Sequence, residues 1–487
     1  MDNLKGKFVN AASWTVFLNA TSQIVSIVFG VVLARLLVPD DFGLIAMASV
    51  FIGFATLLSD VGLGSALVRH QNLNEDYYSS VFWLNLFVGF FLTAIAYFLS
   101  DSIASFYGRE EISSIIEVLS LLFIIRAAAL VPSKILSKQL KFKGVNASHF
   151  IAMTLSGSLA IYMAASGYGI YALIAQQLTM PILAGALIFI ISGWRPKFIY
   201  KSYAIKELLS FSVYVFLTQI VQYVAGTIDK LLTGKFLGAD SVGYLAKSQS
   251  MMLFPIKNVS SMIGSVMFPA LSSVQDDKKR VAKIYLKSVA SIAAITFPMM
   301  AGMFAISENF VLGVLGSQWK PTIPIFMVLC SAGIINSVVT VTGSVFLSQG
   351  ASKLQFHINL VTRFLLISLI VLGLQWGVYG VVIAFAVAAW ISGIISLSFA
   401  TRLIGLSLFD VVRKLSPVFF ASILMGGLAY FLQLFTTELG HLTELALQIC
   451  VGVVTYTLLV IFFQIEAIRD LLDVMPFKIP SAIRKLI

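Results

Sequence analysis

Charged residues are scarce in this chain of 487 residues: Asp, Glu, Lys and Arg supply only 11% of it, whereas 59% is hydrophobic. Soluble globular domains normally carry about 25% charged residues. A membrane-spanning helix needs about 20 consecutive apolar residues, and apolar stretches of that kind recur along nearly the whole sequence. The composition therefore predicts a membrane protein and excludes a large extramembrane catalytic domain.

Cysteine is also scarce. The two cysteines, Cys330 and Cys450, lie inside apolar runs, and neither belongs to a CxxC or another metal-binding spacing. Neither a disulfide framework nor a metal site is therefore expected. We expect each thiol to be a small buried hydrophobic side chain.

Signatures of catalysis are missing as well. The sequence contains no HExxH, no GxSxG and no Walker lysine motif, and residues 62–64 lack the third glycine of a dinucleotide-binding loop. The chain is therefore predicted to be a non-enzymatic protein without a cofactor. Energy for any transport would come from the substrate gradient or from coupling to protons or sodium ions.

Long apolar windows predict an all-α polytopic protein with about fourteen transmembrane helices. Their centres fall near residues 24, 53, 90, 124, 157, 181, 222, 256, 297, 335, 365, 390, 425 and 455.

The distribution of charge predicts the orientation of these helices. Most of the 33 Lys and Arg residues fall in alternate loops that share one side with both termini. The opposite loops and helix ends hold few cations, Arg35, Arg109, Lys235 and Lys320, among several acids. By the positive-inside rule both termini are predicted to be cytoplasmic. The formal net charge of +11 is thus a topology signal, and no nucleic-acid partner is expected.

An internal duplication is visible when the two halves are compared. Four residues of the first half, Leu37, Asp40, Gly43 and Ala46, recur as Leu237, Asp240, Gly243 and Ala246. The offset of 200 grows to 211, where Leu136 and Ser137 match Leu347 and Ser348. We expect both aspartates to cap the helices that follow, and both glycines to allow close approach of the backbone.

The repeat predicts two pseudo-symmetric six-helix lobes, 1–200 and 201–405, related by an axis along the membrane normal. Residues 406–465 then form two additional transmembrane helices, and residues 466–487 a cytoplasmic amphipathic tail. A cavity between two such lobes is a natural binding site for a transported molecule.

Charged residues inside the predicted spans are the first candidates for that site. A charge at mid-membrane costs roughly 2.5–3.5 kcal/mol, so it is expected to face a cavity or a partner. The candidates are Arg126, Asp229, Lys230, Lys247, Lys257 and Arg363. Five cations against one acid suit an anionic ligand. Three amides on two matched helices, Gln23, Gln219 and Gln222, are predicted to line the same cavity.

Other roles stay open for some of these residues. Asp229 is either an ion-coupling group or the partner of Lys230 or Lys247 in a structural ion pair. Lys257 either lines the cavity or extends its side chain to the inner membrane surface. The small residues between the amides are equally explained by helix association.

Several ordered blocks carry a family resemblance. They are LSDVGLGSALVRHQNLNEDYYSSVFWLNL at 58–86, GYGIYALIAQQL at 167–178 and TIDKLLTGKFLGADSVGYLAKSQSM at 227–251. The chain resembles the Wzx-type polysaccharide and O-antigen flippases of the multidrug, oligosaccharidyl-lipid and polysaccharide exporter superfamily, and most nearly their colanic acid or teichuronic acid exporter branch. The likeness covers the first eight helices well and the rest mainly by hydropathy.

This resemblance implies a transporter in the bacterial inner membrane that serves the synthesis of lipopolysaccharide or exopolysaccharide. Its substrate would be an oligosaccharide repeat unit on undecaprenyl pyrophosphate, moved from the cytoplasmic to the periplasmic leaflet by alternating access. Membrane lipid, a polysaccharide polymerase and other export components are the implied partners. A pyrophosphate fits a cationic cavity, while the polyprenyl tail can stay in lipid.

Three rival functions are open. A lipid II flippase also carries a pyrophosphate-linked substrate. A multidrug and toxin extruder shares the superfamily fold, but a cationic interior would repel its cationic drugs. A membrane glycan polymerase or ligase should carry a sizeable periplasmic loop, and the longest predicted outer loops, 101–113 and 308–321, are short.

Overall fold

The computed structural model describes residues 18, 21–60, 63–70, 73–436, 439–464 and 466, and within these ranges the chain forms helices and no strands. This confirms the predicted all-α class. The predicted amphipathic tail lies outside the described residues, except for Glu466.

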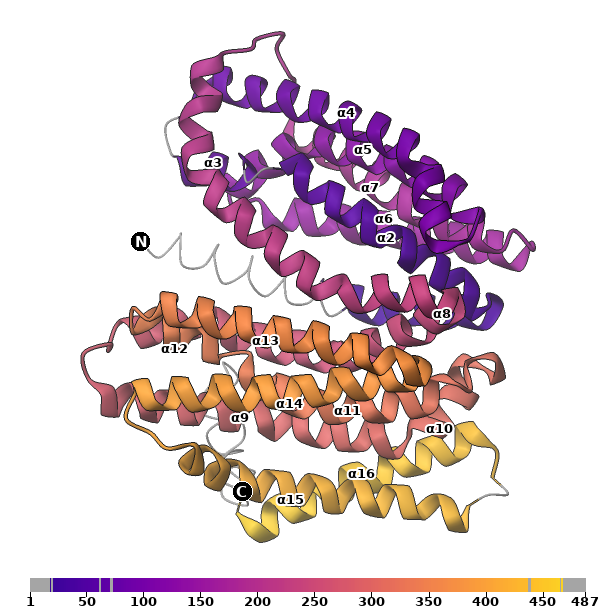
Figure 1. Ribbon diagram of the computed structural model, residues 1–487, viewed down its shortest axis with the longest axis vertical. Helices are drawn as coiled ribbons and strands as arrows, with labels where there is room; N and C mark the ends of the chain where they lie inside the picture. Colours follow the sequence, from indigo (N-terminus) through magenta and orange to yellow (C-terminus); the bar gives the residue numbers. More distant parts are fainter. Residues whose placement is uncertain are drawn as a thin grey trace. The chain divides into compact units, whose positions relative to one another are not determined.

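The chain divides into two compact units, unit 1 (Met1–Gly243) and unit 2 (Tyr244–Ile487), which are described separately here. Unit 1 holds a helix at Thr21–Leu36, then α2 (Pro39–Asp60), α3 (Leu63–Arg69), α4 (Glu75–Tyr107), α5 (Glu111–Lys138), α6 (Phe142–Ala165), α7 (Ile170–Ser192) and the first part of α8 (Ser202–Ser272). Unit 2 holds the rest of α8, then α9 (Lys278–Ala305), α10 (Ser307–Phe310), α11 (Thr322–Val339), α12 (Thr342–Ser348), α13 (Ser352–Gly373), α14 (Gly377–Leu403), α15 (Leu408–Leu432) and α16 (His441–Phe463). Figure 1 traces this order.

Every predicted span centre falls in a helix. In the described part of the chain, ten stretches are long and apolar enough to cross a membrane, and one of them, Ser352–Leu403, contains α13 and α14 in succession. The short helix at Thr21–Leu36 and the two parts of α8 contain the remaining centres. The chain is a multi-pass membrane protein.

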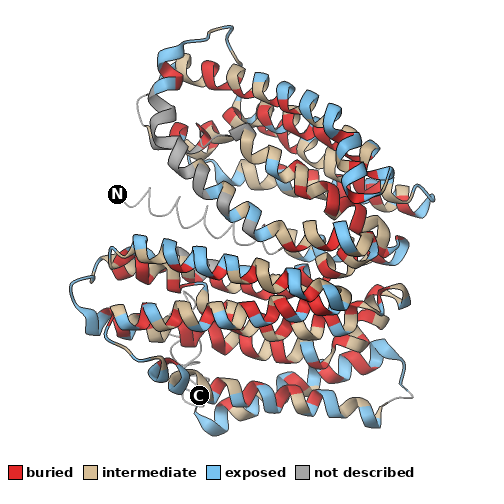
Figure 2. Cartoon of the chain, in the orientation of Figure 1, coloured by how far each residue is buried: buried red, intermediate tan, exposed pale blue. Residues whose placement is uncertain are grey.

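Unit 1 is built from packed pairs of helices. Helix α4 packs on α5, α5 packs on α7, and α6 packs on α7. Large side chains such as Leu119 and Phe123 of α5 are completely buried in its core. Figure 2 shows that buried residues lie mainly where helices face one another, while exposed residues lie on the outward faces. In a membrane such exposed apolar side chains meet lipid.

Unit 2 repeats these pairings with the corresponding helices. Helix α9 packs on α11, α11 on α14, and α13 on α14. The buried hydroxyl of Tyr285 on α9 lies 3.1 Å from the hydroxyl of Thr342. Helices α15 and α16 have no counterpart among the described helices of unit 1. Helix α15 packs on α9, and α16 packs on α15 (Figure 1). The recurring pairings agree with the predicted duplication, although the predicted lobe boundary at residue 200 stays a prediction.

The two repeated glycines lie in a reciprocal contact inside unit 1. A Cβ at Gly43 would overlap the backbone of Ala239, and a Cβ at Gly243 would overlap the backbone of Pro39. Pro39 and Ala239 occupy matching positions at the offset of 200. Helix α2 and the part of α8 after its break at Gly238, where φ is 83°, therefore cross with their backbones in contact. The predicted close approach is confirmed.

Two local predictions are wrong. Asp40 does not precede its helix as a cap: it lies in the first turn of α2, and Arg109 binds it. Cys330 is buried as expected, but Cys450 is exposed on α16. Lipid is as apolar as a protein core, so hydrophobicity alone does not separate a buried position from a lipid-facing one.

Candidate functional site

A polar cavity of about 170 Å³ lies inside unit 2, between α11, α13 and α14. Arg363 lines it near the middle of α13, and Asn359 lies one helical turn earlier on the same helix. Ser392 and Ser396 are spaced in the same way on α14, and Asn336 reaches the cavity from α11. Residues four apart share one face of a helix, so these pairs look into the same space.

The polar groups of this cavity are available to a ligand. Among the described residues, the side chains of Arg363, Asn336 and Asn359 form no hydrogen bond or ion pair with another protein group. Arg363 and Asn359 are exposed, and an uncompensated guanidinium at mid-membrane depth is costly. An oxyanion in the cavity would supply the missing charge.

Unit 1 carries its mid-span cation on a different helix. Arg126 lies in the middle of α5, and its guanidinium donates to Thr56 Oγ1 of α2 at 3.4 Å. That hydroxyl in turn donates to the carbonyl oxygen of Ile52 at 2.7 Å. Within the described ranges no carboxylate lies within 4.0 Å of Arg126. The position of Arg126 thus combines positive charge with an exposed side chain.

The remaining predicted site residues fall in both units. Gln23 is half-buried in the helix at Thr21–Leu36, whereas Gln219 and Gln222 are exposed on α8. Asp229 is buried and Lys230 half-buried on the same helix. A common cavity lined by these residues stays a prediction.

The two lysines of unit 2 differ from each other. Lys247 is half-buried, and its Nζ lies 5.7 Å from the ring centre of Trp319, which is a cation–π geometry. Lys257 is exposed. Their predicted roles as cavity residues stay predictions.

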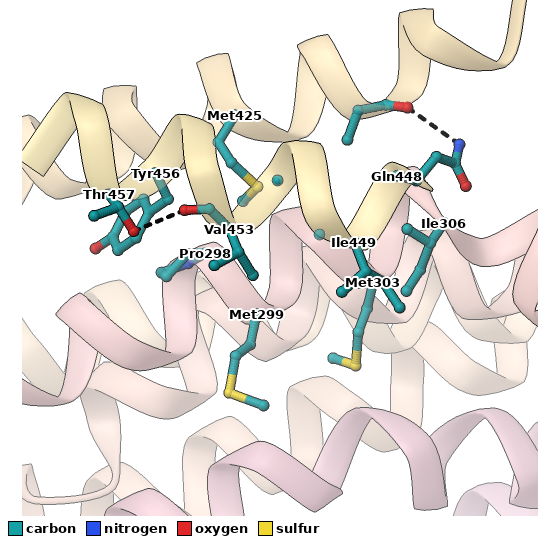
Figure 3. Close-up of a pocket in the computed structure, with 13 residues that line it drawn as sticks. Pro298, Met299, Met303, Ile306, Met425, Gln448, Ile449, Val453, Tyr456 and Thr457 are labelled. Carbon is teal, nitrogen blue, oxygen red and sulfur yellow. Dashed lines mark hydrogen bonds between the residues drawn. The ribbon is translucent and has the colours of Figure 1, made fainter. Parts of the chain in front are cut away.

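An apolar pocket of about 390 Å³ opens elsewhere in unit 2, between α9, α15 and α16. Figure 3 shows three methionines in its lining, Met299, Met303 and Met425, together with Ile449 and Val453. Methionine side chains are flexible and polarisable, so they adapt to a ligand of irregular shape. The chemistry of this pocket suits a hydrocarbon chain.

A polar network closes one end of that pocket. The buried Gln448 accepts a hydrogen bond from Asn309 at 3.1 Å and donates one to the carbonyl oxygen of Ala429, also at 3.1 Å. Asn309 Oδ1 lies 2.9 Å from Nδ1 of His441, at the start of α16. These bonds join α10 and α15 to α16, so they fix the position of the two additional helices within unit 2.

An ion pair lies at the loop between α4 and α5 in unit 1. The guanidinium of Arg109 binds both carboxylate oxygens of Asp40, at 3.1 and 2.8 Å, and Glu111 at 3.2 Å. The hydrogen bonds to Asp40 and then to Glu111 raise the pKa of Arg109, which is therefore charged at every accessible pH. Lys235 of α8 donates to the carbonyl oxygen of Phe106 beside it.

Sequence reasoning missed most of the polar cavity around Arg363. Asn336, Asn359, Ser392 and Ser396 were not among the predicted residues, although each lies within a predicted span. The available signal was the spacing of four between Asn359 and Arg363 on one apolar helix. What hydropathy does not reveal is which helices turn their polar faces toward one another.

Comparison with known proteins identifies the family. Residues 32–324 match the family described as "Polysaccharide biosynthesis protein". The chain belongs to this family. The resemblance predicted from the sequence blocks is thereby confirmed.

Similar curated proteins match between 63% and 95% of the chain. It is 26% identical to the teichuronic acid biosynthesis protein TuaB of Bacillus subtilis, over 95% of this chain and 96% of that protein. It is 25% identical to the lipopolysaccharide biosynthesis protein WzxC of Escherichia coli, over 81% of each. The succinoglycan biosynthesis transport protein ExoT of Rhizobium meliloti is 25% identical over 63% of each chain.

Solved structures show the same fold. The lipid II flippase MurJ, in an inward closed conformation, aligns with a TM-score of 0.73 at 17% identity, over 92% of this chain and 98% of that one. An inward-facing multidrug resistance MATE transporter aligns with a TM-score of 0.63 at 16% identity, over 79% and 94%. The prediction of a transporter that serves polysaccharide biosynthesis, and not of an enzyme, is confirmed by these relatives; its cationic cavity is not tested by them.

Proposed function

We propose that this protein is a flippase that moves oligosaccharide repeat units, linked to a polyprenyl pyrophosphate, from the cytoplasmic to the periplasmic leaflet of the bacterial inner membrane. The observation that carries the proposal is the pair of mid-span arginines, Arg126 and Arg363, in a member of the polysaccharide biosynthesis family; neither has a carboxylate partner among the described residues. Unpaired charge at this depth marks a transport pathway. Negatively charged groups of the substrate would compensate it.

The lipid part of the substrate has a separate place in this proposal. The methionine-lined pocket between α9, α15 and α16 offers an apolar surface along two helices that the duplication does not explain. A polyprenyl chain resting there would remain in a lipid-like environment while the polar head crosses the membrane. Only the charged and hydroxylated part of the substrate then needs a polar route.

Alternating access is the mechanism that we propose for the two repeats. Each state would expose the mid-span cations to one side of the membrane, and substrate binding would shift the balance between states. The loop charges support cytoplasmic termini. Asp229, buried on α8, is our candidate for coupling to protons or sodium ions. A polysaccharide polymerase or another export component is the proposed partner.

The first test is genetic. A deletion strain should accumulate lipid-linked repeat units in the cytoplasmic leaflet and lose one surface polysaccharide, and the wild-type chain should restore both. Arg126→Ala and Lys247→Ala should abolish export while the amount of protein in the membrane stays normal. Arg402→Ala, a charge at the end of α14 outside the proposed site, is the matched control and should export normally.

The same strain separates the rival functions. An unchanged glycan profile with altered drug resistance would replace the proposal by a multidrug extruder. Accumulation of the peptidoglycan precursor lipid II would replace it by a lipid II flippase. Normal export by Arg126→Ala, Lys247→Ala and Arg363→Ala alike would disprove the cationic site.

Coupling and topology have their own measurements. In proteoliposomes that contain the purified chain, flipping of a labelled lipid-linked oligosaccharide should respond to a proton or a sodium gradient, and Asp229→Asn should remove that response. Reporter fusions at the two ends should both be active on the cytoplasmic side. A periplasmic signal from either end would overturn the proposed orientation.

A further inference from the structure

The polar cavity of unit 2 combines groups that a phosphate site does not need. Asn336 and Asn359 each offer an amide donor and a carbonyl acceptor, and Ser392 and Ser396 each offer a hydroxyl that donates and accepts. A fully ionised phosphate has acceptors only, so the two amide carbonyl oxygens would have no partner. Sugar hydroxyls both donate and accept, which matches the set.

The charge of the cavity also differs from that of a pyrophosphate site. Among the residues that the structure describes, Arg363 is the sole charged residue in its lining. One guanidinium neutralises one carboxylate and binds it through two parallel hydrogen bonds. A pyrophosphate would bring at least one further negative charge into the middle of the membrane without compensation.

The size of the cavity limits its ligand to a small group. Sites for drug-sized molecules usually measure about 300–1,000 Å³, whereas this cavity measures about 170 Å³. A whole repeat unit does not fit, but a single ring does. Phe385 adds an aromatic side chain to the lining, against which an apolar ring face can pack.

The first repeat has different residues at the two α13 positions that line this cavity. At the offset of 211, the positions of Arg363 and Asn359 correspond to Ala152 and Ser148 of α6. Both are buried, and the Ser148 hydroxyl donates to the carbonyl oxygen of Gly144 at 2.8 Å. At these two positions the first copy thus has small buried side chains, whereas the second copy has Asn359 and Arg363, which line the cavity.

We propose that the cavity of Asn336, Asn359, Arg363, Ser392 and Ser396 binds one acidic sugar residue of the transported glycan. The carboxylate lies on Arg363, and the ring hydroxyls bond to the amides and serines. This inference rests on the proposed function, because it assigns a part of the substrate to this site. It makes the cavity a selectivity site that distinguishes acidic from neutral glycans, separate from the apolar pocket of α9, α15 and α16.

The experiment measures binding to the full chain in lipid nanodiscs. The probes are methyl glucuronide, methyl glucoside and inorganic pyrophosphate, followed by saturation-transfer NMR and competition. The glucuronide should bind about tenfold more tightly than the glucoside, the difference that a bidentate carboxylate contact supplies. Arg363→Gln should reduce this ratio to about one, and Arg363→Lys should leave an intermediate ratio because lysine lacks the planar fork.

Two further variants keep the test decisive. Lys353→Gln removes a cation from the exposed first turn of α13 and should preserve the ratio. Asn359→Asp places a carboxylate one turn from Arg363, where it competes for the guanidinium, and should weaken glucuronide binding even if Arg363→Gln fails to fold. An unchanged ratio in folded Arg363→Gln, or in Asn359→Asp, would overturn the inference. The inference would also be overturned if pyrophosphate displaced bound glucuronide at a lower concentration than added free glucuronide does. That result would indicate a site for the pyrophosphate of the lipid carrier.

Export in cells separates this inference from the proposed function. Suppose that the wild-type chain and Arg363→Gln restore export of an acidic polysaccharide to the same level. The proposed sugar site is then wrong, whereas the flippase function stands. If the wild-type chain restores no polysaccharide, the proposed function itself fails.

Discussion

Units 1 and 2 share their helix pairings and differ in where they place charge. Helix α4 packs on α5 and α5 on α7, as α9 packs on α11 and α11 on α14. The mid-span cation, however, is Arg126 on α5 in unit 1 and Arg363 on α13 in unit 2, which are not matching positions. What the two copies have in common is needed to build a six-helix lobe. What they do not share is the better guide to what the protein binds.

The largest effect is expected from the shared element, the crossing of α2 and α8. Gly43→Val or Gly243→Val would place side-chain atoms inside the facing backbone, an overpacking that costs roughly 1–3 kcal/mol or more. Folded protein in the membrane should fall severalfold, as measured by detergent-extracted monodisperse protein and by its Tm. Gly226→Ala, where a Cβ meets no atom within 4 Å, is the control. If Gly226→Ala lowered the amount of folded protein and its Tm equally, the effect would come from any substitution in α8 and not from the backbone contact.

The next largest effect should separate the two arginines. Arg363→Gln and Arg126→Gln should each reduce export more than about tenfold, because each removes a charge that would bind the substrate. Only Arg363→Gln should change the ratio of acidic to neutral glycan exported. The measurement is surface polysaccharide composition at matched protein levels. If both variants shift that ratio equally, the arginines act as one site and the comparison between the units fails.

A smaller effect should follow from the helices that only unit 2 possesses. Gln448→Leu would leave the buried Asn309 amide and the Ala429 carbonyl oxygen without their partner, at a cost of roughly 1–3 kcal/mol. The Tm of the purified protein should fall by a few degrees. Leu458→Ala, on the exposed face of α16, should change it much less. An unaltered Tm for Gln448→Leu would show that the network does not hold α16.

The smallest effect is expected from the ion pair of unit 1. Arg109→Gln removes a pair whose side chains are about one-third exposed, 33% for Arg109 and 30% for Asp40. Such pairs contribute roughly 0.2–1 kcal/mol, and salt screens them. The stability difference between wild type and variant should therefore shrink as salt rises. A difference that is independent of salt would point to packing of the arginine stem instead.

The sequence predicted the helices far better than it predicted their faces. Long apolar runs are sufficient to place a span, and the matching of Gly43 with Gly243 was sufficient to predict a close backbone approach. The sequence did not predict the exposure of Cys450 or the cavity beside Arg363. A hydropathy scale does not distinguish a lipid-facing position from a position in the protein core. The pairing of Asp40 with Arg109 was missed for another reason: it joins residues that are 69 positions apart.

The reciprocal glycine contact also has a consequence for the origin of the chain. Gly43 meets Ala239 while Gly243 meets Pro39, so each partner presents the same surface to the other. This is the isologous form of contact that relates identical subunits of a twofold dimer. A single ancestral six-helix protein would have been able to pair with a second copy through this surface. Joining two copies of its gene would then have preserved an interface already in use.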